Sequence, residues 1–235
     1  MTAAQPLAVL PLRRWRLDTT CLVIGSMSPD FEYFLRLELL STVSHTLLGL
    51  LYFCVPVTLA AALLFHRVLK WPALRVAPWR GRFAVFAERP WPVQPLWILV
   101  LSALLGAATH FVWDGITHAE GYGPRYFAFL RTPVPVPLVG SMVLHRIIQH
   151  TSTLVGLTIL SIVVGRALAR VTPLPVPAPT SRRRLAWIAA IAVVTALSLV
   201  RVFVLHLSDP GSFVVAIIDG GLGGALIASL VMPSR

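Results

Sequence analysis

Three side chains that can bind a metal ion recur at four-residue spacing near the middle of the chain: His110, Asp114 and His118. On an α-helix, a step of four residues turns by about 400° and rises about 6 Å, so these side chains form one stripe. Neutral imidazole and carboxylate groups are the usual ligands of zinc, manganese and iron. Polar groups in apolar surroundings are costly unless they are paired, hydrated or bound to a metal. The spacing therefore predicts a metal site, with an interhelical hydrogen-bond ladder as the alternative.

Further ligand-type side chains lie where apolar segments begin. Asp30 ends a Ser-Pro-Asp turn, and His45 and His150 each open an apolar run. Helix capping is the alternative role for these three residues. We expect the metal ligands to be Asp30, His45, His110, Asp114 and His150. We expect His118, or a carboxylate such as Glu32 or Glu120, to assist as a further ligand or as an acid–base group.

The composition indicates which elements must position these residues. The chain has 235 residues, of which 57% are hydrophobic and only 12% charged, and its mean hydropathy is +0.79. A soluble domain carries roughly a quarter charged residues, so this chain requires an apolar solvent such as a lipid bilayer. Five apolar segments are long enough to span the hydrocarbon: residues 45–65, 95–114, 151–168, 185–207 and 213–232.

These segments predict an all-α protein, a polytopic transmembrane helix bundle of about five spans. An N-terminal membrane-embedded or re-entrant helix is expected within residues 18–42, and whether that segment crosses the bilayer is left open. We expect a single integral membrane domain, residues 1–235. Its parts are an N-terminal segment (1–44), the metal-site helices (45–168), a Pro/Arg linker (171–184) and a C-terminal helical hairpin (185–232).

The formal net charge of +11 comes from 20 Lys and Arg against 9 Asp and Glu. Many of the arginines lie in the loop between the first two spans and in the linker 171–184, which the alternation of spans puts on one side with the C-terminus. The positive-inside rule makes that side cytoplasmic and puts the His/Asp cluster on the other side. Because the charges lie in short loops rather than along a basic helix or sheet, the sequence disfavours nucleic acid as a partner.

Other function classes lack their motifs. The two cysteines, Cys21 and Cys54, are too few for a disulfide framework or a Cys-based zinc site. The sequence shows no serine-hydrolase elbow, P-loop or dinucleotide fingerprint, and no cleavable signal peptide is evident. In the C-terminal hairpin, Arg201 and Asp219 are equally far from Pro210, which predicts an ion pair between them, with separate snorkelling as the alternative.

The order of the motifs resembles an uncharacterised bacterial membrane family, the domain of unknown function 4184. The resemblance covers most of residues 7–160 and rests on Leu10-Pro-Leu, Gly25-Ser-Met-Ser-Pro-Asp30, Ser44-His-Thr-Leu-Leu-Gly49, Thr109-His110, Trp113-Asp114, Thr117-His118 and Gln149-His150. More distantly, the pattern is similar to bacterial inner-membrane proteins called membrane-bound metal-dependent hydrolases. Their His-x-x-x-Asp element is similar to that of zinc-dependent phospholipase C and the P1-type nucleases.

The resemblance implies a hydrolase-like metal site and a place in the bacterial inner membrane. The expected metal is zinc, or else manganese or iron, and the expected partners are membrane lipid and a lipid-like or phosphoester substrate. The family pattern usually has a histidine just before the Leu-Pro-Leu stretch, and residues 3–7 here contain none, which bears on the number of metal ions. The alternatives are a cation- or proton-coupled transporter that uses the same polar groups and a catalytically inactive membrane scaffold.

Overall fold

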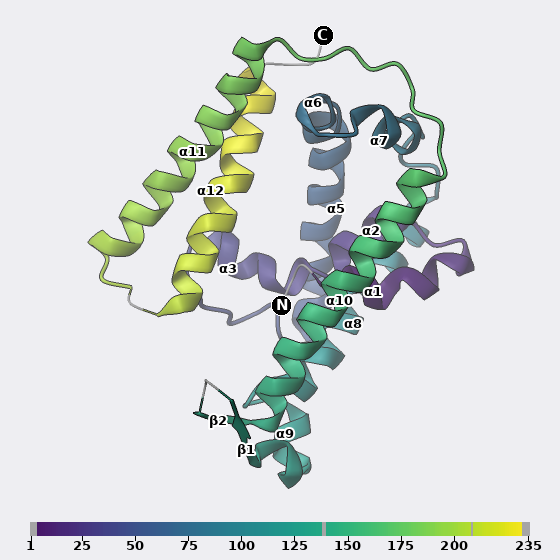
Figure 1. Cartoon of the computed structure of the whole chain (residues 1–235). Helices are drawn as coiled ribbons and strands as arrows, with labels where there is room; N and C mark the ends of the chain where they lie inside the picture. The colour runs from purple at the N-terminus through teal and green to yellow at the C-terminus, as the bar shows by residue number, and fades with distance from the viewer. Residues whose placement is uncertain (1–3, 138–139, 208, 232–235) are drawn as a thin grey trace. The chain divides into compact units, whose positions relative to one another are not determined.

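The computed structural model describes residues 4–137, 140–207 and 209–231, whose regular secondary structure is helical apart from one short β-ribbon (Figure 1). Five helical segments in this part of the chain are long and apolar enough to cross a membrane: Leu47–Val76, Leu96–Tyr126, Leu144–Ala169, Ser181–Val204 and Pro210–Val231. Each of them overlaps one predicted span, so the all-α class and the five apolar helices are confirmed. Met232, the predicted end of the fifth span, lies outside the described residues, as does the C-terminus.

The chain divides into two compact units. The first comprises Met1–Pro29, Val43–Leu59 and Gln94–Arg166, and the second comprises Asp30–Thr42, Ala60–Val93 and Ala167–Arg235. In the first unit, α2 (Thr19–Gly25) and η4 (Leu50–Cys54) both pack on α8 (Leu96–Thr117). In the second unit, α12 (Pro210–Val231) packs on α11 (Ser181–Val204) and on α3 (Phe31–Arg36). The expectation of a single domain stays a prediction.

The first apolar run is one continuous helical path with two π-helical turns. It consists of α4 (Leu47–Gly49), η4, α5 (Val55–Leu64), η5 (Phe65–Leu69) and α6 (Lys70–Val76). Pro56 and Pro72 have no N–H to bond to the carbonyls four residues earlier, at Tyr52 and Val68. Those two residues lie in the π-helical turns η4 and η5, so the prolines explain where the helical hydrogen-bond pattern changes.

Short elements connect the remaining long helices. After α6 come α7 (Arg80–Ala87) and then α8, and α8 is followed by α9 (Tyr122–Tyr126) and η6 (Ala128–Arg131). Strands β1 (Pro133–Val136) and β2 (Gly140–Val143) pair antiparallel, with Pro133 opposite Val143. Helix α10 (Leu144–Ala169) follows directly. The ribbon is an addition to the predicted all-α fold, and both of its strands are edges, where proline is tolerated.

The N-terminal segment forms several short helices. These are α1 (Pro6–Val9), η2 (Leu10–Trp15), α2, η3 (Ser28–Asp30) and α3. Helix α2 has seven residues and α3 has six, about 10 Å each, against roughly 30 Å for the hydrocarbon core. Residues 18–42 therefore do not form one long crossing helix.

Helices α2 and α8 approach each other closely because small residues face each other. A Cβ on Gly25 would lie 2.5 Å from the Ala103 carbonyl oxygen, and a Cβ on Gly106 would collide with the Leu22 carbonyl oxygen. The Ser102 hydroxyl accepts a hydrogen bond from the Asp18 N–H at 2.9 Å. The Asp18 carboxylate in turn caps α2 by accepting from the Cys21 N–H at 2.8 Å. This contact fixes the start of α2 against α8 about two turns before His110.

We expect Gly106→Ala to destabilise the protein by about 1–3 kcal/mol, because the added methyl group forces the two backbones apart. The measurement is the thermal unfolding of the detergent-solubilised protein. Gly165→Ala in α10 is the matched control, since a Cβ there meets nothing within 4 Å. A helical glycine in open space gains stability from alanine, so the control should be neutral or slightly stabilising. Equal effects of the two substitutions would contradict the packing account.

The C-terminal hairpin also packs through glycines. A Cβ on Gly220 would collide with Thr195, and a Cβ on Gly224 would lie 2.5 Å from the Ile191 Cα, so these residues face each other across α11 and α12. Arg201 is six residues beyond Thr195, about 9 Å nearer the connecting loop, whereas Asp219 adjoins Gly220.

The predicted ion pair between Arg201 and Asp219 is therefore wrong. In the described part of the chain, the Arg201 guanidinium donates to the Leu37 carbonyl, and Asp219 Oδ2 has no hydrogen-bond partner. The prediction failed because it centred the hairpin on Pro210. That residue is the first of α12, and the centre of the hairpin lies earlier, between the end of α11 at Val204 and Pro210.

Candidate metal centre

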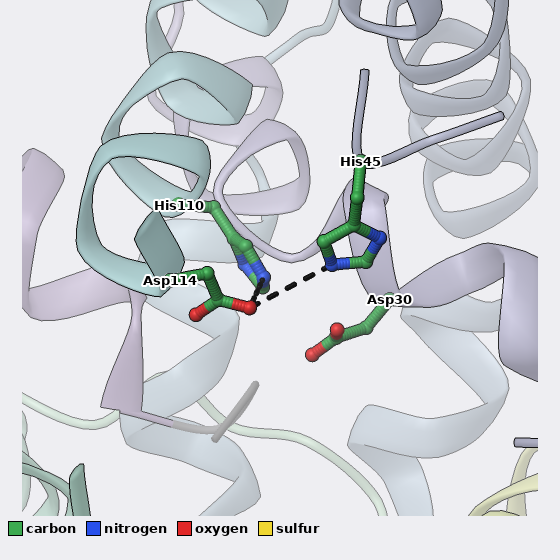
Figure 2. A group of neighbouring side chains, drawn as sticks. All are labelled: Asp30, His45, His110 and Asp114. Atoms are coloured by element: carbon green, nitrogen blue, oxygen red, sulfur yellow. Dashed lines mark hydrogen bonds and ion pairs between the residues drawn. The ribbon is translucent and has the colours of Figure 1, made fainter. Parts of the chain in front are cut away.

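Four of the five predicted metal ligands lie together. Each offers one ligand atom, and these atoms are all within 4.8 Å of one another: Asp30, His45, His110 and Asp114 (Figure 2). His110 and Asp114 come from the last two turns of α8, as the four-residue spacing predicted. Asp30 ends η3, whose first two residues belong to the first unit, so the backbone of that turn sets its position.

The turn before α4 positions His45. Thr46 caps the helix, since its hydroxyl accepts from the Gly49 N–H at 2.9 Å and donates to the Val43 carbonyl at 2.8 Å. A Cβ on Gly49 would collide with the Val43 carbonyl oxygen, so this tight turn requires glycine. The Cys54 thiol lies 3.6 Å from the Ser44 carbonyl oxygen and holds the turn from the other side. The Ser-His-Thr-Leu-Leu-Gly motif thus builds the turn that presents the His45 imidazole.

The imidazole of His110 is completely buried and is oriented by a backbone carbonyl. Its Nδ1 lies 2.8 Å from the Ser26 carbonyl oxygen, which can only accept, so Nδ1 carries the proton. In the neutral ring, Nε2 then presents a lone pair, and it faces the Asp114 carboxylate oxygen Oδ2 at 3.2 Å. Two electron-rich atoms in this arrangement require either a second proton on the ring or a cation between them.

The Asp114 carboxylate is the centre of the cluster and has an unused oxygen. Its Oδ2 lies 3.2 Å from His110 Nε2 and 3.6 Å from His45 Nε2. Its Oδ1 is buried and has no hydrogen-bond partner in the described part of the chain. Charge-assisted N–H···O bonds are about 2.7–2.9 Å long, whereas the ligand atoms of a tetrahedral zinc site lie about 3.3–3.6 Å apart. The spacing and the orphaned oxygen fit a metal ion better than direct hydrogen bonds.

Asp30 does not serve as a helix cap. It occupies the N-cap position of α3, but its carboxylate makes no capping hydrogen bond there. Figure 2 shows this carboxylate pointing toward Asp114 and the two imidazoles. The capping alternative for Asp30 therefore fails, and the donor set comprises two imidazole nitrogens and two carboxylate oxygens, which suits zinc, manganese or iron.

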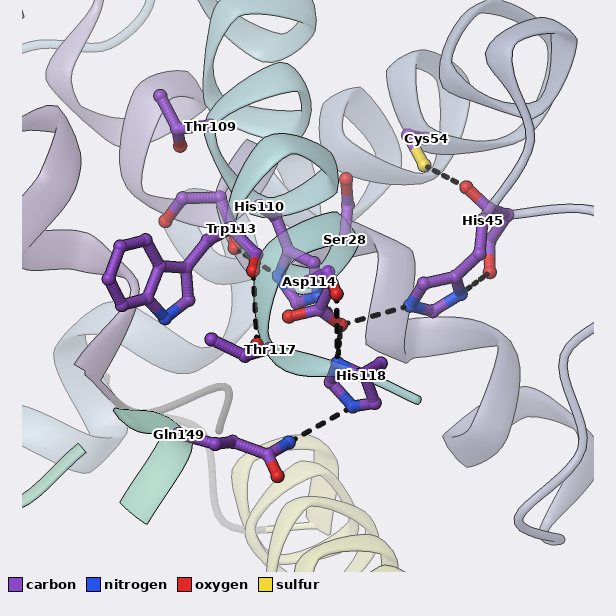
Figure 3. Close-up of polar contacts among 12 residues, drawn as sticks. Ser28, His45, Cys54, Thr109, His110, Trp113, Asp114, Thr117, His118 and Gln149 are labelled. Atoms are coloured by element: carbon purple, nitrogen blue, oxygen red, sulfur yellow. Dashed lines mark hydrogen bonds and ion pairs between the residues drawn. The ribbon is translucent and has the colours of Figure 1, made fainter. Parts of the chain in front are cut away.

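His118 lies beside the cluster and supports Asp114. Its Nδ1 is 3.5 Å from Asp114 Oδ2 and 3.3 Å from the Asp114 carbonyl oxygen. On its other side, the Gln149 amide nitrogen donates to His118 Nε2 at 3.0 Å (Figure 3). Since Nε2 accepts, Nδ1 carries the proton and faces the carboxylate as a donor. His118 therefore orients the Asp114 side chain rather than binding a metal through Nδ1.

Three predicted site residues are not brought into the cluster. His150 lies in α10 with an exposed side chain, and it is not among the four convergent residues. The Glu120 carboxylate is 91% exposed and pairs with Arg125 at 3.5 Å. The buried Glu32 carboxylate forms an ion pair with Arg36 Nη2 at 2.8 Å and accepts hydrogen bonds from Ser41 and Thr42.

Two contributors to the centre were missed by sequence reasoning. The Ser26 carbonyl is a backbone group, and no side-chain pattern could reveal it. Gln149 precedes His150, and adjacent residues on a helix point about 100° apart, so only one of them can face α8. The structure selects Gln149, although the sequence favoured His150 because imidazole is the more common ligand.

We expect Gln149→Ala to weaken metal binding by up to about tenfold, because the substitution frees the His118 ring that orients Asp114. His150→Ala on the same turn should leave metal affinity unchanged, since that side chain lies outside the cluster. The measurement is a titration of the metal-free protein with zinc by calorimetry or a competing chelator. A larger loss for His150→Ala than for Gln149→Ala would reverse the assignment.

The fold and the site together define a class: an all-α protein with five apolar helices and a His/Asp cluster that could hold a metal ion. The chain belongs to the family described as Domain of unknown function (DUF4184), whose model matches residues 1–232. The match extends across both compact units. No curated protein and no solved structure matches the chain.

Proposed function

We propose that this protein is an integral membrane hydrolase that uses a divalent metal ion held by His45, His110, Asp114 and Asp30. One observation carries the proposal: with His110 Nδ1 bonded to the Ser26 carbonyl, His110 Nε2 lies 3.2 Å from a carboxylate oxygen of Asp114, whose other oxygen is buried without a hydrogen-bond partner among the described residues. A hydrogen-bond ladder would satisfy these atoms with protons. A cation satisfies them together and accounts for the convergence of four ligand atoms from three separate segments.

The residues around the cluster would have distinct roles. The Ser26 carbonyl holds the His110 ring with Nε2 directed into the site, and His118 holds the Asp114 carboxylate. The His45 side chain is 25% exposed, so the cluster is open to solvent on that side. A bound zinc ion would lower the pKa of a coordinated water and polarise a phosphoryl or carbonyl oxygen. The solvent-accessible side near His45 is where a substrate would enter.

A phosphoester, such as a lipid headgroup, is the proposed substrate class. The support is the resemblance of the His-x-x-x-Asp element, His110 and Asp114, to that of metal-dependent hydrolases that act on phosphoesters. The proposed setting is a bacterial inner membrane. The loop charges support an orientation with the arginine-rich loops on the cytoplasmic side and the cluster near the opposite face.

The proposal is tested with metal-loaded protein and a panel of phosphomonoesters, phosphodiesters and phospholipids. We expect metal-dependent release of product from at least one class, and a loss of at least about a hundredfold in Asp114→Asn, which weakens the metal site. Glu120→Gln is the control, because this exposed carboxylate pairs only with Arg125 among the described residues. Metal binding without turnover, together with metal uptake into vesicles that contain the protein, would favour the transporter alternative.

A further inference from the structure

A basic pocket lies within the second unit, at the start of α11. Its volume is about 620 Å³, and its lining includes Arg75 of α6 together with Pro177, Pro179, Thr180, Arg182 and Arg183. The pocket contains none of the residues of the His/Asp cluster. Cavities of about 300–1,000 Å³ are typical of small-molecule sites, so this one is large enough for a phosphate with its attached glycerol.

The pocket is strongly cationic. Three guanidinium groups line it, and none of its lining residues in the described part of the chain is acidic. Guanidinium groups bind phosphate oxygens in a planar, two-pronged geometry that ammonium groups cannot match. The pocket also lies at the N-terminus of the 24-residue helix α11, whose dipole adds positive potential there. The charge and geometry favour a phosphate-bearing anion.

The arginines near the pocket are divided between two tasks. Arg80 Nε donates to the Val176 carbonyl at 3.0 Å, and Arg82 donates to the Leu168 carbonyl at 2.8 Å. The Leu174 N–H donates to the Gly81 carbonyl at 2.9 Å. The bonds at Val176 and Leu174 fix the proline-rich linker against α7, so the wall formed by Pro177 and Pro179 is stiff.

The side chains of Arg75 and Arg182 do not donate to backbone carbonyls as those of Arg80 and Arg82 do. In the described part of the chain, neither side chain makes a hydrogen bond or an ion pair, and both line the cavity. The guanidinium groups of Arg80 and Arg82 hold backbone carbonyls of the linker and of α10, while those of Arg75 and Arg182 remain available to a ligand. This division distinguishes a binding pocket from a loop that is merely rich in arginine.

The position of the pocket along the helices indicates the source of the phosphate. Arg75 is one residue from the end of the apolar segment Leu47–Val76, and Arg182 is one residue from the start of Ser181–Val204. If these segments cross a bilayer, their ends lie at the level of the lipid headgroups. We propose that the pocket binds the headgroup phosphate of an anionic phospholipid, an inference that rests on the membrane placement in the proposed function but not on the hydrolase activity.

The test uses the full-length protein purified from membranes in detergent micelles. Phosphatidylglycerol, phosphatidylcholine or inorganic phosphate is added, and thermal unfolding and lipid retention in native mass spectrometry are measured. We expect phosphatidylglycerol alone to raise the unfolding temperature. Arg75→Gln and Arg182→Gln should each weaken this effect about fivefold in apparent affinity. Arg184→Gln is the matched control, because Arg184 lies in the same turn of α11 but outside the lining.

Each alternative outcome overturns the proposal in a recognisable way. An equal loss in Arg184→Gln would mean that general surface charge attracts the lipid. A full stabilising effect of inorganic phosphate would identify a soluble anion as the ligand, and an equal effect of phosphatidylcholine would remove the anionic preference. Because Arg182 is exposed, its substitution keeps the test valid even if Arg75→Gln folds poorly. Recovery of the protein in the soluble fraction would refute the membrane placement itself, and the pocket proposal with it.

Discussion

Replacing His110 with alanine is expected to lower the affinity of the protein for zinc by roughly a hundredfold. A structural zinc ion is bound with about 10–16 kcal/mol, and losing one of four ligands removes about a quarter of that free energy. The effect should be large because the ring is fully buried and Ser26 orients its free nitrogen into the cluster. The measurement is the metal content of protein purified and dialysed against zinc, with elemental analysis as the readout.

Two further variants make this result specific. Asp114→Asn keeps the size of the side chain but removes the charge that a cation requires, so it should lose metal as His110→Ala does. His150→Ala removes an exposed imidazole outside the cluster and should retain wild-type metal content. If His110→Ala folds poorly, His45→Ala replaces it, because that side chain is 25% exposed and its loss leaves a smaller cavity. Equal metal content in all variants would refute the metal centre.

Glu32→Ala is expected to lower the free energy of unfolding by about 3 kcal/mol while leaving metal content unchanged. The carboxylate is 3% exposed and accepts from four donor groups: the Arg36 guanidinium, with Nε at 2.9 Å and Nη2 at 2.8 Å, the hydroxyls of Ser41 and Thr42, and the Thr42 N–H at 3.0 Å. Removing it leaves these donors without their acceptor. Metal content should persist because Thr46 and Cys54 hold the turn that carries His45.

The control for Glu32 is Glu38→Ala, since Glu38 is exposed and lies in the loop just beyond α3. Its loss should change stability by less than about 0.5 kcal/mol. Chemical unfolding in detergent, followed by tryptophan fluorescence, measures both variants. A catalytic role for Glu32, as the sequence suggested, would instead appear as lost turnover with unchanged stability, and this outcome would contradict the structural role.

The apolar helices were predictable because their signal is local. Long runs of apolar residues, broken by arginine- and proline-rich loops, specify helices that require an apolar environment, and all five were found where the runs occur. The N-terminal segment was not predictable to the same degree. Its apolar stretches are short, so whether they join into one helix or separate into α2 and α3 depends on packing against other elements.

The candidate site was predictable in part for a similar reason. His110 and Asp114 are four residues apart on one helix, and helical geometry alone places them together. His45 and Asp30 were predicted to be further ligands because they lie where apolar segments begin, and the structure brings the ligand atoms together. Gln149 and His150 are neighbours, and the rotation of α10 about its own axis decides which of them meets His118. No pattern within α10 specifies that rotation.

The sequence by itself determined the helical class, the apolar character of the five long helices and the stripe of ligand-type side chains on α8, because each depends on residue type and on spacing within one element. Only the tertiary structure decided the register of the C-terminal hairpin, the tautomer of His110 and the separation of Glu32 and His150 from the His/Asp cluster. These features depend on contacts between distant segments, such as the glycines that set the α11–α12 approach and the Ser26 carbonyl that reaches His110. Such contacts are set by packing in three dimensions, to which local sequence patterns contribute only indirectly.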